Sequence, residues 1–269
     1  MILINDNCLT YMKNMEDGVI DMTVTSPPYE DLRDYSGIEW NANIWQNILK
    51  ELFRVTKPGG VCAWIVADKT KNFSESGESF RQALFAKEIG FCLYDTMIYQ
   101  KDSPPCNDNR YNQDFEYIFI FSKGKPTRWN PIMEKTKNHG SCQCSRSYRI
   151  SNGKTKKMKK SFIKKEKTKS NIWKYQVGFQ KTTKDTYAYE HPAMFPENLA
   201  RDLIITWTNE GDLVFDPMMG SGTTGKMAML LNRDFIGIEI SEQYFQLVKK
   251  RIERNKPLFF TDKIEYVIN

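Results

Sequence analysis

The stretch that decides the fold is LVFDPMMGSGTTG, residues 213–225. A short apolar run ends at Asp216, a glycine-rich turn follows, and the helix-forming segment KMAMLL (226–231) comes next. A strand, a tight turn and a helix form the unit that builds a nucleotide pocket at the carboxyl edge of a parallel sheet. The next apolar run, FIGIE (235–239), ends in Glu239, at about the 20-residue distance expected of an acid that holds a ribose diol.

The charge at the end of the first strand selects the kind of ligand. Gly220 to Gly225 fits the pattern GxGxxG, which by itself permits a dinucleotide. The carboxylate of Asp216 would repel a pyrophosphate, and it suits the ammonium and sulfonium groups of S-adenosylmethionine. Glycines then let the backbone approach an amino acid and a nucleoside closely. The simpler alternative is that Gly220 and Gly222 only make a strand-to-helix turn.

A second motif lies near the other end of the chain, in DMTVTSPPY (21–29). Pro27 and Pro28 lack N–H groups and have a fixed φ, so they predict a strand that breaks at a rigid, outward-facing corner. Ser26 presents a hydroxyl and Tyr29 a flat ring at that corner. An isolated SPPY is better explained as a prolyl turn with a buried tyrosine, but its pairing with the glycine motif favours a catalytic corner.

With both motifs in place, the sequence resembles the β-class, SPPY-type DNA amino-methyltransferases, in which the SPPY motif comes first and the DPxxGSGTT motif near the end. The resemblance implies an α/β fold with a Rossmann-like, S-adenosylmethionine-dependent methyltransferase sheet, a circularly permuted motif order and an inserted target-recognition region. The implied parts are a catalytic part at 1–124, the recognition insertion at 125–188 and a cofactor-binding part at 189–269. The implied catalytic residues are Ser26, Pro27, Pro28 and Tyr29.

The cofactor residues that the resemblance and the glycine motif imply are Asp6, Thr25, Pro196, Asp216, Pro217, Met218, Gly220, Ser221, Gly222, Thr223, Thr224 and Glu239. Asp6 is expected at the adenine, although a helix N-cap explains it equally well. Pro196 closes the segment HPAMFP (191–196), expected at the methionine end of the pocket, and a helix start also explains it. Met218 departs from the family, which usually has a phenylalanine there.

The rest of the chain alternates between strand and helix patterns, which predicts a mostly parallel sheet. Helical spacing of apolar residues runs from Ile44 to Val55 and stops at Pro58–Gly60, and a buried strand follows at 61–67. Two further strands, 92–100 and 116–121, are joined by a loop without a helix. They predict an antiparallel hairpin at one edge of the sheet.

From residue 125 to about 188 the regular pattern fails, and lysines and aromatic residues alternate. The expected DNA-binding residues are Arg146, Arg149, Lys154, Lys156, Lys157, Lys159 and Lys160, because cations attract phosphates without reading sequence. A solvated loop is the simpler interpretation of such a charge run. His139, Cys142 and Cys144 could bind zinc, but the spacing is tight and a fourth ligand is not evident, so no metal is expected.

The composition fits such an enzyme. The net charge is +6 and the sequence pI about 8.8, a mild basic bias that suits a polyanion. Six scattered cysteines suggest a reduced, cytoplasmic protein, and neither a signal peptide nor an apolar run long enough for a membrane is evident. Double-stranded DNA is the expected partner. A cognate restriction endonuclease, the recognition sequence and the choice between monomer and homodimer stay open.

The expected chemistry is direct methyl transfer to an exocyclic amino group of a base that has been flipped out of the duplex. The Ser26 hydroxyl and the Pro27 carbonyl would accept the amine hydrogens and localise its lone pair, while Tyr29 stacks on the base. A neutral serine favours cytosine N4, and adenine N6 is the alternative. A dinucleotide-dependent oxidoreductase would leave the SPPY corner and Asp216 without a role. A DNA-binding module with a decayed site is not indicated, because the motif residues are present.

Overall fold

The computed structural model describes residues 1–28, 40–102, 110–141, 147–157, 162–257, 260 and 263–268. These residues form two compact units, one made of 1–130 with 171–269 and a smaller one made of 131–170. Several residues singled out from the sequence lie outside the described residues: Tyr29, Cys142, Cys144, Arg146, Lys159 and Lys160.

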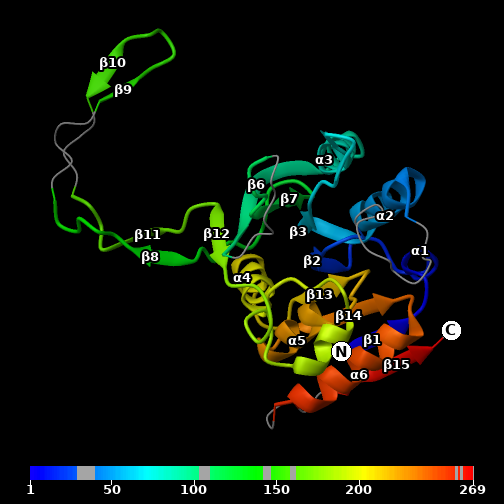
Figure 1. The fold of residues 1–269 in the computed structure, drawn as a ribbon. Helices are drawn as coiled ribbons and strands as arrows, with labels where there is room; N and C mark the ends of the chain where they lie inside the picture. The colour runs from blue at the N-terminus through cyan, green and yellow to red at the C-terminus, as the bar shows by residue number, and fades with distance from the viewer. Residues whose placement is uncertain are drawn as a thin grey trace. The chain divides into compact units, whose positions relative to one another are not determined.

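In the described part of the larger unit, nine strands form one sheet in the order β12-β6-β7-β3-β2-β13-β14-β1-β15 (Figure 1). Among these strands, β7 is antiparallel to both of its neighbours, β3 and β6, and the other neighbouring pairs are parallel. The bounds are β1 Ile2–Asn5, β2 Ile20–Thr25, β3 Thr56–Val66, β6 Cys92–Lys101, β7 Phe115–Ser122, β12 Ile172–Tyr175, β13 Leu213–Asp216, β14 Asp234–Glu239 and β15 Glu265–Ile268. The mostly parallel sheet with an antiparallel hairpin is therefore confirmed.

Helices cover both faces of this sheet. Helix α1 contacts α2, and α2 contacts α3. Helix α2 also packs on β3, and α3 packs on β6 and β7. Helices α4 to α6 pack together and on β1, β2, β13 and β14, on the opposite side (Figure 1). The bounds are α1 Cys8–Lys13, α2 Ala42–Val55, α3 Glu78–Glu88, α4 Glu197–Trp207, α5 Thr223–Leu230 and α6 Glu242–Asn255, with a short 3₁₀ helix η1 at Thr186–Glu190.

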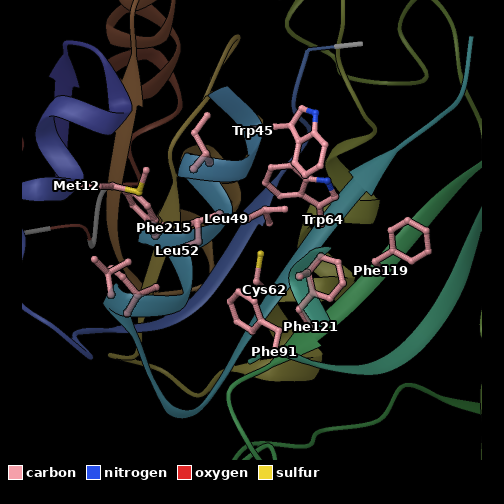
Figure 2. Packing of buried hydrophobic residues seen from close by; sticks show 14 of the residues in the cluster. Met12, Trp45, Leu49, Leu52, Cys62, Trp64, Phe91, Phe119, Phe121 and Phe215 are labelled. Carbon is pink, nitrogen blue, oxygen red and sulfur yellow. The ribbon is translucent and has the colours of Figure 1, made fainter. Parts of the chain in front are cut away.

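The core between α2 and the sheet is the apolar stripe that the sequence spacing predicted. Trp45, Leu49 and Leu52 of α2 face Cys62 and Trp64 of β3 in a cluster closed by aromatic side chains (Figure 2). The members from α2 recur three and four residues apart, which places them on one helix face. Burial of this stripe fixes α2 against the sheet.

The boundary between α2 and β3 differs from the prediction. The helix ends at Val55, before Pro58–Gly60, and β3 begins at once with Thr56. Thr56 pairs with Ile20 of β2, and its hydroxyl donates to the carbonyl of Leu52 at 2.5 Å. Tertiary pairing with β2 therefore ends the helix before the proline does.

Strand β12 lies outside the predicted hairpin, at one end of the sheet, and pairs in parallel with β6. Its burial alternates, with Ile172 and Lys174 exposed and Trp173 and Tyr175 buried. This period of two is what a strand with one covered face requires. The Tyr175 hydroxyl donates to Asp202 of α4 at 2.8 Å, so a segment expected in the recognition region instead completes the sheet.

The smaller unit contains two short antiparallel pairs. Strand β8 (Met133–Lys135) pairs with β11 (Glu166–Thr168), and β9 (Ser147–Arg149) pairs with β10 (Thr155–Lys157). Every residue of β9 and β10 is exposed. No helix among the described residues is long and apolar enough to cross a membrane.

Candidate active site

The two motifs, almost 200 residues apart in sequence, meet because β2 and β13 are neighbouring parallel strands. Val214 pairs with Met22 and Phe215 with Thr23, so both strands end at the same edge of the sheet. The hydroxyl of Thr224 lies 2.7 Å from Oδ2 of Asp216 and 3.2 Å from the carbonyl oxygen of Val24. One hydroxyl from the start of α5 therefore contacts the ends of both strands. Its contact on β2 is Val24, which lies one residue before Thr25 and two before Ser26.

Asp216 itself is turned inward. Its side chain is buried, and its Oδ1 accepts from the backbone N–H of Met218 at 3.2 Å. Burial raises the pKa of Asp216 to about 6, against the lowering effect of the hydrogen bond from Thr224. Asp216 is not among the residues that line the cavity described below. The carboxylate of Asp216 therefore holds the turn through its hydrogen bonds. Its negative charge can act on a ligand in the cavity only across the turn, without direct contact.

The glycine turn is held by Glu239. The N–H of Gly220 donates to Oε2 of Glu239 at 2.8 Å, and the N–H of Ser241 donates to Oε1 at 2.9 Å. Gly220 has a φ of +51°, which a residue with a side chain rarely adopts. Burial raises the pKa of Glu239 to about 7, although these backbone donors favour the charged form. Glu239 lines the cavity and keeps lone pairs for a further donor.

The segment before α4 closes over the same turn. A Cβ at Gly220 would lie 2.9 Å from Nε2 of His191, so this glycine is required by close approach as well as by its φ. The His191 ring packs on Tyr244 of α6 at 4.4 Å between centroids. Residues 191–195 line the cavity, whereas Pro196 is buried and precedes the first turn of α4. Residues 191–195 of this segment therefore line the cavity, and Pro196 marks the point at which the segment enters α4.

The end of β1 excludes one of the two interpretations of Asp6, the N-cap. Asn7, and not Asp6, caps α1, because its side chain accepts from the backbone N–H groups of Leu9 and Thr10. The N-cap interpretation of Asp6 is therefore wrong. Asp6 lines the cavity together with Asn7, Cys8 and Leu9.

These elements surround a cavity of about 860 Å³, within the size range of small-molecule sites. It extends along the carboxyl ends of the parallel strands, from Asp6 after β1 to Val177 after β12. The predicted residues that line it are Asp6, Ser26, Pro28, Pro217, Met218, Gly220, Ser221, Thr223 and Glu239. The predicted residues behind this lining are Thr25, Pro27, Pro196, Asp216, Gly222 and Thr224, which are buried or shape the turn.

Sequence reasoning missed the part of the cavity beyond Ser26. Strand β6 ends and β7 begins at this edge, so the cavity is lined there by Tyr99, Lys101, Phe115 and Glu116. The Nζ of Lys101 lies 2.6 Å from Oε1 of Glu116, and the pKa of the Tyr99 hydroxyl is raised by burial. The hairpin itself was predicted, but only the sheet order shows which of its ends faces the cavity.

A buried ionic network supports the glycine turn from the other side. Arg251 of α6 is fully buried and pairs with Asp185 at 2.8 Å and with Glu197 at 2.7 Å, and Lys226 contacts the same two carboxylates. Nη1 of Arg251 also donates to the carbonyl of Ser221 at 2.9 Å. Burial opposes charge, but the pairing with both cations lowers the pKa of Asp185 and Glu197 overall. The network ties η1, α4, α5 and α6 to one another behind the site.

The basic residues predicted to bind DNA belong to the smaller unit. Arg149, Lys156 and Lys157 are exposed residues of the β9–β10 hairpin, and Lys154 lies in the turn, where its carbonyl accepts from the N–H of Ile150. Tyr148, between them, is about half exposed.

Among the described residues, no group of three or more histidine, cysteine, aspartate or glutamate side chains is arranged to hold a metal ion.

Comparison with known proteins identifies the family. Residues 20–250 match the model of the N6/N4 methyltransferases, described as DNA methylase, and the chain belongs to this family. It is 51% identical over 245 residues to the orphan methyltransferase M.BamHII of Bacillus amyloliquefaciens, with 90% of this chain and 91% of the relative covered. It is 28% identical over 287 residues to the type II methyltransferase M.SmaI of Serratia marcescens, with 91% and 88% covered.

Solved structures agree on the fold. The PvuII DNA methyltransferase, described as cytosine-N4-specific, superposes with a TM-score of 0.69 at 18% identity, covering 99% of this chain and 94% of that one. The complex of M1.HpyAVI with S-adenosyl-L-methionine gives a TM-score of 0.61 at 22% identity, covering 93% and 98%. The predicted S-adenosylmethionine-dependent methyltransferase fold is confirmed, and S-adenosyl-L-methionine is the cofactor of this family.

We predict that Thr224→Val, which keeps the shape but removes the bridging hydroxyl, lowers the free energy of unfolding by about 1–3 kcal/mol. The reason is that the buried Asp216 carboxylate loses a hydrogen bond that nothing replaces. Urea denaturation followed by circular dichroism measures the change. Thr10→Val, at an exposed position of α1, is the matched control. Equal denaturation midpoints for the two variants would show that this hydroxyl does not hold the junction.

Proposed function

We propose that this protein transfers a methyl group from S-adenosyl-L-methionine to the exocyclic amino group of a flipped-out DNA base, with cytosine N4 as the target. The observation that carries the proposal is the shared cavity. Ser26 of the SPPY corner and the turn from Pro217 to Ser221 line one continuous space at the edge of one sheet. The donor of a methyl group and its acceptor can therefore lie side by side, as in-line transfer requires.

The cavity residues near β1, β13 and β14 fit the parts of the cofactor. Glu239 has free lone pairs at the level where β14 ends and would accept from the ribose hydroxyls. Asp6 would contact the adenine, and residues 191–195 would enclose the methionine end. The bare Cα of Gly220 leaves the backbone close to His191, with no side chain to fill the turn. When bound, the cofactor supplies an electrophilic methyl group on a sulfonium.

The SPPY corner would prepare the amine. An exocyclic amino group is a poor nucleophile because its lone pair is delocalised into the ring. Acceptance of its hydrogens by the Ser26 hydroxyl and the Pro27 carbonyl would localise that pair toward the methyl group. Tyr29 would stack on the base. Rate enhancement then comes from positioning and fixed dipoles, without a covalent intermediate on the protein.

The preference for cytosine rests on Ser26. The hydroxyl is neutral, so it tolerates the O2/N3 acceptor edge of cytosine better than a carboxylate at the same place would. Adenine N6 is the second candidate, since the same acceptors suit its amine. Membership in the N6/N4 family covers both bases, and it leaves the dinucleotide oxidoreductase alternative without support.

Contact with double-stranded DNA is assigned to the β9–β10 hairpin of the smaller unit. Its exposed Arg149, Lys156 and Lys157, with Lys154 in the turn, present cations on a short ribbon. Such cations bind phosphates and position the protein, while the neighbouring Tyr148 can reach a base. Arg146, Lys159 and Lys160 continue this charge in the sequence.

The test is to incubate plasmid DNA with the protein and S-adenosyl-L-methionine, digest it to nucleosides and identify the methylated base by mass spectrometry. N4-methylcytosine is the expected product, and single-molecule sequencing of the same DNA gives its sequence context. N6-methyladenine would replace the first candidate by the second. The absence of any methylated nucleoside would refute the proposal.

We predict that Ser26→Ala lowers kcat by about 10²–10³-fold, the usual effect of removing one group that stabilises a transition state. Affinity for S-adenosyl-L-methionine, measured by calorimetry, should stay within about twofold of wild type, because Ser26 faces the amine and not the cofactor. Steady-state kinetics on DNA measures kcat, and single-turnover kinetics measures the rate constant of the methyl-transfer step itself. A parallel loss of cofactor affinity would indicate that Ser26 holds the fold of the corner instead.

We predict that affinity for the cofactor falls by about tenfold when the pH is lowered from 8 to 6. Burial raises the pKa of Glu239 to about 7, so in the free protein this carboxyl is protonated below pH 7. The ribose hydroxyls need the charged form as acceptor, and binding below pH 7 must first remove that proton. S-adenosylhomocysteine should show the same dependence in calorimetry. An analogue without the 2′ and 3′ hydroxyls should bind weakly at both pH values, and identical behaviour of the two ligands would contradict the role of Glu239.

A further inference from the structure

A small hairpin beside the cavity carries an unusual turn. Strands β4 (Thr70–Lys71) and β5 (Ser74–Glu75) are joined by Asn72 and Phe73, which have φ values of +50° and +64°. Two-residue hairpin turns of this kind prefer asparagine followed by glycine. A bulky aromatic residue in the left-handed region is a conformational outlier, because its Cβ crowds the backbone. Phe73 thus occupies a position that suits glycine.

Burial within the chain does not compensate for this strain, because Phe73 is fully exposed, at 101% of its reference area. Leu84 on α3 is also apolar and exposed, but its backbone is helical and needs no explanation. A strained backbone persists where it serves a function, and a strained, exposed aromatic side chain suggests a contact made outside the chain.

The base of the hairpin is fixed at the rim of the cavity. Lys69 and Thr70 line the cavity, and the Lys69 carbonyl accepts from the N–H of Ser76 at 2.8 Å. The buried Asp68 then accepts from the Ser76 hydroxyl at 2.9 Å and from the N–H of Ser79 at 3.1 Å. With two residues per strand, the tip stands roughly 7 Å beyond that anchored base.

We propose that Phe73 is a wedge that enters the base stack of the DNA as the target base leaves it. This inference rests on the proposed function, which requires base flipping. Flipping unstacks the neighbouring bases, and proteins that deform DNA insert apolar side chains such as phenylalanine between base steps. Lys69, Lys71 and Arg110 bring three cations to the hairpin, against Glu75 on the hairpin and the buried Asp68 at its base. These positive charges suit the DNA phosphates on either side of the gap that the flipped base leaves in the stack.

The variant that tests the wedge is Phe73→Gly, which relieves the turn and removes the ring. We expect an equal or higher melting temperature, because glycine adopts positive φ without strain. We also expect methylation of a fully paired duplex to slow by about tenfold or more, since no side chain then occupies the vacated stack. Phe73→Trp, which keeps a flat ring, should restore most of the rate. Leu84→Ala is the matched control and should leave the rate unchanged.

A second substrate separates the wedge from a general DNA contact. In a duplex whose target base stands opposite an abasic site, the base is already unpaired, so Phe73→Gly should methylate it within about twofold of wild type. Fluorescence of 2-aminopurine placed next to the target base should report less unstacking by the variant in paired DNA. Equal slowing on both substrates, or a wild-type rate on paired DNA, would overturn the wedge while leaving the proposed function intact. A wild-type protein that methylates neither duplex would overturn the proposed function, and the wedge with it.

Discussion

The site depends on the parallel pairing of β2 with β13 and on the hydroxyl of Thr224 that bridges their ends. The strand order brings Ser26 and Asp216 to one edge, although the chain between them includes the hairpin, β12 and the smaller unit. Parallel strands end together at the same edge only when a crossover returns the chain to the opposite side. The order of the two motifs in the sequence is therefore free, provided that their strands are neighbours.

Two carboxylates at this edge have pKa values raised by burial, but they have different roles. Asp216 and Glu239 are both buried, and both accept hydrogen bonds from the backbone of the glycine turn, which partly offsets the loss of solvation. Asp216 uses its oxygens within the turn and lies behind the cavity, whereas Glu239 also faces it. The turn is thus held by Glu239 on the cavity side, and by Asp216 and the Arg251 network on the buried side.

Local patterns in the sequence predicted the elements that a single stretch can define. The apolar runs that became β2, β13 and β14, and the helical stripe of α2, needed no tertiary information. What the sequence could not show was fixed by pairing between distant segments. The end of α2 was set by Thr56 pairing with Ile20, β12 was a strand only because β6 offered an edge, and the cavity face of the HPAMFP segment depended on His191 packing against the glycine turn.

The reversed strand β7 extends the cavity beyond Ser26, because it brings its own first residues to the edge where the parallel strands end. In a parallel sheet only the carboxyl ends of strands reach the ligand edge. Because β7 is antiparallel, its first residues, Phe115 and Glu116, lie at that edge beside the last residue of β6, Lys101. The described end of the connection between β6 and β7, residues 110–114, therefore also lies at the ligand edge, where Arg110 and Gln113 line the cavity. A sheet with β7 parallel would send that connection to the opposite edge and leave the space beyond Ser26 without these walls.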